Sequence, residues 1–446
     1  MKKTFTPISS GFLSILKTFK KAGFMLGLIT ATIVGTASAQ TILYVTPTGG
    51  SAIQNGQSWA TAYPGGQLQT RINAAAVSYA NTGTKTEIWV QAGTYVPALN
   101  PVSGSIDNRD KTFLLKDGVA LYGGFNGTET LLSKRNLATG GATILSGDID
   151  NNSPANITGD AYHVVVTVGA NSTTILDGFT IQYGNANGSG FGTISGTGIT
   201  RTNGGGIYNA SSDPTLRNNT FIANNALSSG GGIYNTLSSP VIINTVFSDN
   251  TANDLGGAMY NNGSSPQVIN STFSKNKATT SGGAIRNSMS LANPVFTNSI
   301  IYGNMKTSLV ADNFGDNSSV VTYSLVEGGY NGGTNIILSD PLFVNAATGN
   351  FQLQPKSPAI GVGNNAGIPA GITRDRNSEL RIQKTTVDMG AYESAYSTLT
   401  GNANGVVYVK KGSTGDLSGD SWANAITDVA DALHAAQSNT AIKEIW

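Results

Sequence analysis

The sequence contains no cysteine, only two histidines, and few charged residues, which make up 11% of its 446 residues. The absence of cysteine excludes disulfides, thiol nucleophiles and cysteine-based metal sites. The 26 basic and 25 acidic side chains give a net charge of +1, so the charge favours neither nucleic acid nor an anionic membrane as a partner. Low charge with ordinary hydrophobicity argues against disorder. It suits a stacked β architecture, in which like charges in register would repel each other.

Glycine, by contrast, is abundant, with 56 residues, and many of them belong to a repeat between residues 204 and 304. The hexapeptide GGGIYN at 204–209 returns at 230–235, then as GGAMYN at 256–261 and as GGAIRN at 282–287, so each step is 26 residues. A second motif, Phe-x-x-Asn, begins at Phe221, Phe247 and Phe273, and Ile301 replaces Phe in its last copy. A fixed period of this length is typical of a solenoid.

The repeat predicts an all-β fold, because it consists of short, partly alternating runs bounded by Gly, Ser, Asn and Pro. We expect a right-handed parallel β-helix, a three-sheet solenoid with about 26 residues per coil. Equivalent residues of successive coils then lie about 4.8 Å apart. Three apolar columns are expected inside the stack: Ile207, Ile233, Met259 and Ile285; Leu216, Ile242, Val268 and Phe296; and Phe221, Phe247, Phe273 and Ile301.

Asparagine fills three further columns of the repeat. They are Asn209, Asn235, Asn261 and Asn287; Asn218, Asn244, Asn270 and Asn298; and Asn224, Asn250, Asn276 and Asn304. Stacked amides can hydrogen-bond along a column, and Asn tolerates the left-handed backbone of a tight bend. We therefore interpret these residues as structural corner ladders and not as ligands.

The two motifs in phase resemble the repeat of the polymorphic outer-membrane proteins, which are surface-exposed adhesins with β-helical passengers. The match covers residues 204–304, with departures at Gly206, Gly232, Arg286 and Ile301. The resemblance implies a secreted or cell-surface protein, on the extracellular face of an outer membrane, that binds glycans or the surface of a host or neighbouring cell.

The chain in order predicts further parts. Residues 1–39 have a basic start, an apolar run at 22–34 and the small residues Ala37-Ser38-Ala39, which together indicate a cleaved secretory signal. Residues 40–110 form an N-terminal cap with an amphipathic helix at about 66–80, and this segment resembles the cap of pectin-lyase-like β-helix proteins. Residues 111–395 form the β-helix, with a loop projecting at 184–203 and a closing segment at 340–395.

Residues 396–405 are expected to be a linker, after which the beginning of the chain returns. Val407-Tyr408-Val409 matches Leu43-Tyr44-Val45, Ser421-Trp422-Ala423 matches Ser58-Trp59-Ala60, and Glu444-Ile445-Trp446 matches Glu87-Ile88-Trp89. We expect residues 406–446 to be the truncated start of a second β-helix module in a longer natural chain.

An enzymatic function is the alternative for this architecture, since parallel β-helices also include polysaccharide lyases and glycoside hydrolases. Such enzymes need clustered carboxylates, often with Ca²⁺, and an Arg or Lys base. Two sets of residues fall at different phases of the repeat and are not expected to converge: Asp213, Asp249 and Asp254, and Arg201, Arg217 and Arg286. His163 and His434 stand alone beside apolar residues, which favours a structural role. We predict no catalytic residues and no cofactor, and keep a lyase or hydrolase as the alternative.

Residues 148–152, with the sequence DIDNN, resemble the start of a Ca²⁺ loop. The later Gly and Glu of such a loop are missing. We interpret the segment as a polar turn and predict no metal site.

One column is expected to face outward, next to the inward Ile207 column. It consists of Tyr208, Tyr234 and Tyr260, followed by Arg286. An exposed aromatic stripe can bind sugar rings by stacking; the alternative is aromatic packing between coils. The sequence thus favours a non-catalytic, adhesin-like surface protein, with a structural envelope or matrix stalk as a further possibility.

Overall fold

The computed structural model describes residues 41–446 except 52, 289–291, 308–309, 384, 395–398, 400, 416, 428, 430–431, 434–435 and 437–438. The predicted secretory signal, His434 and part of the predicted linker therefore lie outside the described residues. Within the described part, no helix is both long and apolar enough to cross a membrane.

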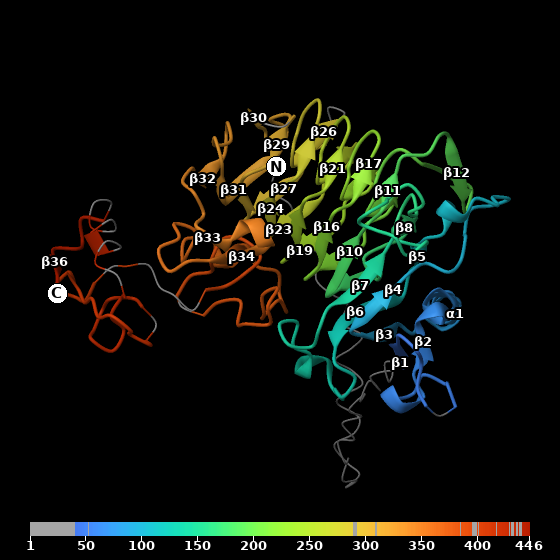
Figure 1. Cartoon of the computed structure of the whole chain (residues 1–446), viewed down its shortest axis with the longest axis horizontal. Helices are drawn as coiled ribbons and strands as arrows, with labels where there is room; N and C mark the ends of the chain where they lie inside the picture. The colour runs from blue at the N-terminus through green and yellow to red at the C-terminus, as the bar shows by residue number, and fades with distance from the viewer. Residues whose placement is uncertain are drawn as a thin grey trace, which may run out of the picture. The chain divides into compact units, whose positions relative to one another are not determined.

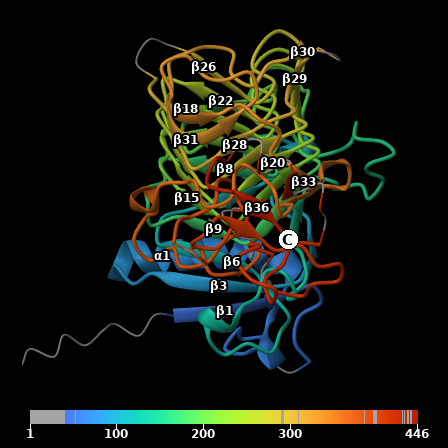
Figure 2. The ribbon, with the colours of Figure 1, turned by 90° about the vertical axis from the view of Figure 1, so that its left-hand side faces the viewer.

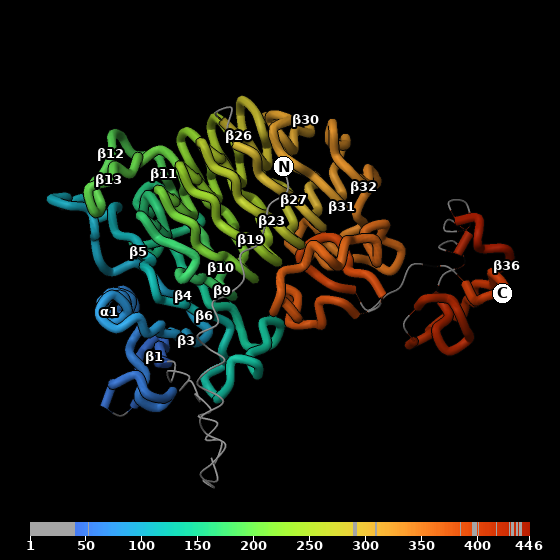
Figure 3. The backbone as a smooth tube through the Cα atoms, turned by 180° about the vertical axis from the view of Figure 1, so that it is seen from behind, coloured from blue at the N-terminus to red at the C-terminus, as the bar shows by residue number. Residues whose placement is uncertain are grey.

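The chain winds as a parallel β-helix in which each coil of the regular repeat adds one strand to each of two sheets and two strands to the largest sheet (Figure 1, Figure 3). The sheet that carries the tyrosine column consists of β5 (Phe113–Leu115), β8 (Val165–Val168), β14 (Ile207–Ala210), β18 (Ile233–Thr236), β22 (Met259–Asn262) and β26 (Ile285–Ser288). Figure 2 shows β18, β22 and β26 lying next to one another in this order. We call this sheet the tyrosine sheet.

The largest sheet has 18 strands in two parallel ladders that meet in β31. The first ladder runs through β1 (Thr41–Thr46), β3 (Thr86–Gln91), β6 (Val119–Phe125), β9 (Ile175–Asp177), β15 (Thr215–Arg217), β19 (Val241–Ile243), β23 (Gln267–Ile269), β27 (Val295–Thr297), β31 (Val320–Val326) and β32 (Thr334–Ile337), with β2 (Tyr63–Pro64) beside β1. The second runs through β4 (Gly93–Tyr95), β7 (Thr143–Ser146), β10 (Phe179–Gln182), β16 (Thr220–Ile222), β20 (Val246–Ser248), β24 (Thr272–Ser274) and β28 (Ile300–Ile301).

A third sheet is built from strands of two residues each: β11 (Asn185–Ala186), β17 (Asn225–Ala226), β21 (Thr251–Ala252), β25 (Lys277–Ala278), β29 (Met305–Lys306) and β30 (Val310–Ala311). Outside the coils lie the antiparallel pairs β12 (Phe191–Ile194) with β13 (Thr197–Thr200) and β33 (Phe343–Asn345) with β34 (Asn350–Leu353). Short 3-10 turns are η2 (Trp59–Thr61), η3 (Gly65–Gln67), η4 (Asn108–Asp110), η5 (Leu132–Lys134), η6 (Ala346–Thr348) and η7 (Asn365–Gly367).

The predicted register of 26 residues is confirmed. Ile207 pairs with Ile233, and Phe221 pairs with Phe247. The rings of Phe221, Phe247 and Phe273 are stacked at centroid distances of 4.8 and 4.5 Å and are fully buried. All three apolar columns belong to one continuous hydrophobic core, so each coil buries its apolar residues against its neighbours.

The predicted amide ladder is continuous in two of the asparagine columns. Along the tyrosine sheet, Nδ2 of each Asn donates to Oδ1 of the Asn one coil further on, over 2.8 Å at each of the three steps from Asn209 to Asn287. Thr167 donates to Asn209 at one end, and Asp316 accepts from Asn287 at the other. The column from Asn224 to Asn304 is linked in the same way. Because these side chains are buried, the ladders satisfy amides that would otherwise be unpaired.

The third column, Asn218 to Asn298, is linked at two of its three steps, where Asn244 donates to Asn218 (3.1 Å) and Asn298 donates to Asn270 (3.5 Å), and it has a further role. Its members have positive φ values, between 48° and 54°, and make the bend between the two ladders of the large sheet. In the Phe-x-x-Asn motif the left-handed residue is instead the one before the Asn, such as Ala223 or Asp249. The closing segment also docks on this third column: Asn244 donates to Arg374 O (2.8 Å), and Asn270 donates to Asp388 O (3.2 Å).

The cap is also confirmed, as the helix α1 (Leu68–Thr82). Its residues Leu68, Ile72 and Ala75 are buried in the core. β5 is the end strand of the tyrosine sheet, so its edge would be unpaired. Gln69 covers that edge: its side chain accepts from Leu114 N (2.8 Å) and donates to Leu114 O (2.9 Å), in place of a neighbouring strand.

The C-terminal residues repeat the local structure of the N-terminal ones. β35 (Val406–Val407) pairs in parallel with β36 (Glu444–Ile445), as β1 pairs with β3. Trp446 Nε1 donates to Glu444 (2.8 Å), as Trp89 Nε1 donates to Glu87 (2.7 Å). The two segments thus share pairing and aromatic contacts, while the assignment of residues 406–446 to a second module stays a prediction.

Candidate ligand-binding groove

The tyrosine column lies where the sequence predicts it, in register on the outer face of the tyrosine sheet. The rings of Tyr208 and Tyr234 are 5.0 Å apart, and those of Tyr234 and Tyr260 are stacked in parallel at 5.4 Å. Packing between coils, the alternative considered above, therefore accounts for the contacts of these side chains.

The expected exposure of the column is wrong for two of its three tyrosines. Tyr208 and Tyr234 are buried, and Tyr260 is half-buried. The reason is that residues 184–203 do not simply project: they form the hairpin β12–β13, whose Ile194 and Ile199 pack against the column. Burial raises the pKa of Tyr234 to about 12. A ligand can thus reach the column only around Tyr260.

The hairpin creates a different recess, which the sequence does not predict. A groove of about 390 Å³ separates the hairpin from the segment 102–107, and the hydrogen bond from Ser103 N to Thr193 O (2.9 Å) joins its two walls. Figures 1 and 3 show β12 beside this segment. Phe191, 65% exposed, and the exposed Ile106 lie on opposite walls. We call this recess the hairpin groove.

Charged side chains at the hairpin groove are held in fixed positions. Arg201 donates two hydrogen bonds to Asp110, from Nε (2.9 Å) and from Nη2 (2.5 Å), and Ser105 donates a third to the same carboxylate (2.5 Å). The hydrogen bonds to Asp110 raise the pKa of Arg201. Asp107 accepts from the Tyr162 hydroxyl (2.9 Å). These bonds fix the charged groups at a groove whose lining also includes the apolar side chains of Val102, Ile106 and Phe191.

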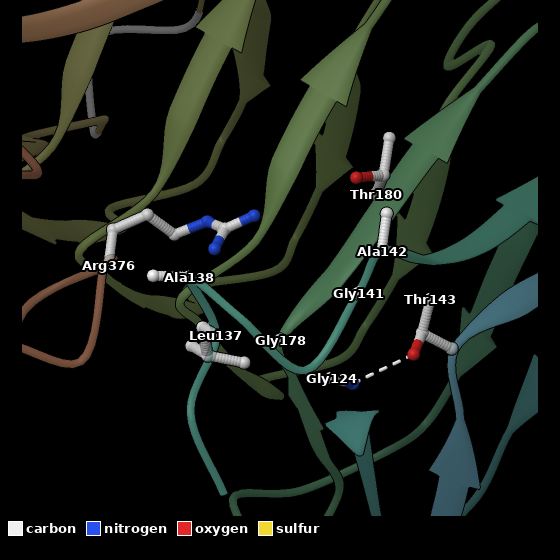
Figure 4. Close-up of a pocket in the computed structure, with 9 residues that line it drawn as sticks. All are labelled: Gly124, Leu137, Ala138, Gly141, Ala142, Thr143, Gly178, Thr180 and Arg376. Atoms are coloured by element: carbon white, nitrogen blue, oxygen red, sulfur yellow. Dashed lines mark hydrogen bonds between the residues drawn. The ribbon is translucent and has the colours of Figure 1, made fainter. Parts of the chain in front are cut away.

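A second hollow, of about 220 Å³, lies against the large sheet (Figure 4). It is lined by Gly124, Leu137, Ala138, Gly141, Ala142, Thr143, Gly178, Thr180 and Arg376. Arg376 is the one ionisable residue in this lining, and its guanidinium donates to Thr220 (3.2 Å). With no carboxylate among these residues, the hollow does not have the groups that acid–base cleavage of a polysaccharide needs.

Asp213, Asp249 and Arg217 of the repeat each bind a different partner and do not share a site. Asp249 forms an ion pair with Lys275 (3.0 Å), Asp213 accepts from Ser239 N (2.6 Å), and Arg217 binds Asp177 of the preceding coil (2.5 Å). His163 is buried, and its Nδ1 is bonded to Gly204 O (2.9 Å). The side-chain amides of the predicted Asn residues are hydrogen-bonded within the ladders or to the closing segment. None of these residues lines the hairpin groove.

The groove residues Ile106, Asp107 and Phe191 escape prediction because they lie in segments without a period. Their only sequence signal is an apolar residue inside a polar loop, which occurs in many loops. Arg201 and Asp110 are 91 residues apart in the chain, and only the folded coil brings them together.

Comparison with known proteins gives little for this chain. No known family matches it, and no curated protein matches it. Among solved structures, a crystal structure of the pectate lyase Pel9A aligns with 80% of this chain and 97% of its own, at 12% sequence identity and a TM-score of 0.30.

Proposed function

We propose that this chain is a non-catalytic, adhesin-like surface protein whose β-helix presents the hairpin groove to glycans. The observation that carries the proposal is the exposed Phe191 ring opposite the exposed Ile106, in a groove that is also lined by Arg201, which the buried Asp110 holds in place. Aromatic rings bind the apolar faces of sugars, and charged groups orient their hydroxyls. The half-buried Tyr260 is a secondary contact on the same outer face.

Surface display is part of the same proposal. It is supported by the predicted secretory signal at residues 1–39 and by the resemblance of residues 204–304 to surface-exposed repeat proteins. The stacked core explains how such a protein stays folded without disulfides, because each inner coil is buried against two others.

A glycan array probed with the full chain tests the proposal. We expect selective binding that Phe191→Ala weakens about five- to ten-fold, since loss of one stacking ring costs on the order of 1–1.5 kcal/mol. Leu237→Ala is the matched control, because Leu237 is equally exposed but lies on a different loop. Binding that survives both Phe191→Ala and Tyr260→Ala, or no binding to any glycan, contradicts the proposal.

A polysaccharide lyase or hydrolase is the second candidate. It is favoured by one observation: Asp107 and Arg201 both line the groove, and Arg201 is paired with the buried Asp110. Against it, Asp110 is buried and already accepts from Arg201 and Ser105, so it is not free to exchange a proton with a substrate. Release of reducing sugar or of unsaturated products from pectic and other polymers would establish this function instead.

A further inference from the structure

Three carboxylates converge at the turn after β7. Asp148 and Asp150 belong to the polar turn described from the sequence, and Asp160 comes ten residues later. One oxygen from each of the three lies within 4.8 Å of the others. Three acidic groups at this spacing repel one another unless a proton or a cation lies among them.

Of the three carboxylates, Asp160 gives the evidence for a bound ligand. Its side chain is completely buried, and while Oδ2 accepts from Ser153 (2.7 Å), Oδ1 is buried without a hydrogen-bond partner. A buried carboxylate oxygen that lacks a partner is costly, since it loses its water without any replacement. This oxygen belongs to a side chain that shares the space of Asp148 and Asp150.

The basic side chain beside the cluster, Arg109, offsets only part of its negative charge. Arg109 Nε donates to the backbone O of Asp160 (2.6 Å), and Nη2 donates to Asn185 O and to Asn187 Oδ1. None of the ion pairs found among the described residues involves the three carboxylates. Burial, together with the neighbouring acidic charges, raises the pKa of Asp160 to about 6. Among the described residues, the fold thus gathers three carboxylates that form no ion pair.

The ligand set favours Ca²⁺ over Mg²⁺. Ca²⁺ takes about six to eight oxygen ligands in flexible geometry, whereas Mg²⁺ demands a near-ideal octahedron and usually keeps several of its waters. Ca²⁺ also accepts irregular geometry and carboxylates in either mono- or bidentate mode. Gly159 leaves room for this arrangement, because a Cβ there would collide with Asp150 Oδ2.

We infer that Asp148, Asp150 and Asp160 form a structural Ca²⁺ site that fastens the loop between β7 and β8 to the stack. Asn152 already orients two of the ligands: its backbone N donates to Asp148 (2.9 Å) and its Nδ2 to Asp150 (2.9 Å). Ala161 N, next to Asp160, bonds to Gly147 O (2.8 Å), so the cation would close a loop whose two ends already meet. The site does not depend on the proposed glycan binding.

Thermal unfolding of the full chain, freed of metal with a chelator, tests the site. Saturating CaCl2 should raise the Tm by about 2–5 °C, as expected for a ligand that binds only the folded state, and MgCl2 should raise it less. Calorimetric titration with CaCl2 should give one site per chain. Asp160→Asn should abolish the shift, and without Ca²⁺ this variant should melt above the wild type because the buried charge is gone.

Two further variants keep the test decisive. Asp150 is exposed, so Asp150→Asn should fold normally yet bind Ca²⁺ about ten-fold more weakly. Asp254→Asn, an acidic loop residue of the repeat, should keep the whole shift. The inference is overturned if the wild type shows neither heat nor shift, if Asp160→Asn retains the shift, or if Mg²⁺ produces an equal one.

Discussion

Replacement of Asn235 by alanine tests the amide ladder, the feature that most distinguishes this core from an ordinary apolar one. Asn235 lies in the middle of the ladder: it accepts from Asn209 Nδ2 and donates to Asn261 Oδ1, each over 2.8 Å. All three side chains are fully buried. The substitution therefore leaves one donor and one acceptor without partners and beyond the reach of solvent.

The magnitude follows from these two groups. An unsatisfied buried polar group costs about 1–3 kcal/mol, so two of them cost about 2–6 kcal/mol. The variant also no longer has to bury the polar amide of Asn235 on folding. The desolvation free energy that is avoided in this way offsets part of the cost. We expect the free energy of unfolding to fall by about 2–5 kcal/mol.

Urea unfolding followed by far-ultraviolet circular dichroism measures this change. The matched control is Asn262→Ala: Asn262 lies on β22 beside the ladder but faces outward, with only long contacts to Thr236 (3.4 Å) and Tyr234 (3.5 Å). It should change stability by less than about 0.5 kcal/mol. If Asn235→Ala costs no more than Asn262→Ala, the ladder does not stabilise the core and the reasoning fails.

Three other predictions concern the core, the acid limit and the alkaline limit. Phe247→Ala, which removes a ring stacked on both sides, should cost about 3–5 kcal/mol in urea unfolding, whereas the exposed Phe191→Ala should cost less than about 0.5 kcal/mol; similar values would contradict the stack. Burial lowers the pKa of His163 from 6.5 to about 4. The neutral ring therefore stabilises the fold above pH 6.5, and this stability is lost as the pH falls through 4. In thermal melts, the Tm of His163→Gln should fall less with acid than the Tm of the wild type. Burial raises the pKa of Glu393 from 4.5 to about 8, although the positive charge of Arg381 acts in the opposite direction. The stability that this group contributes is complete below pH 4.5 and is lost as the pH rises through 8. A Tm of Glu393→Gln that still falls between pH 5 and 9 would refute this.

Much of the fold can be predicted from the sequence because residues that lie one repeat period apart are also in contact. Residue i touches residue i+26, so the Phe247 column, the Asn235 ladder and the strand register can be taken directly from the repeat. The cap helix is predicted within two residues of its observed start and end, since its apolar spacing needs no knowledge of its partner.

The sequence by itself thus determined the stack, its core columns and its capped first coil. Only the tertiary structure decided what covers the stack: the hairpin that buries Tyr208 and Tyr234, the groove at Phe191, and the closing segment on the Asn244 column. It also brought Asp160 to the turn that the sequence alone left without a metal. The physical reason is that these segments have no period, so their neighbours depend on how loops of different lengths fold back, and not on spacing along the chain.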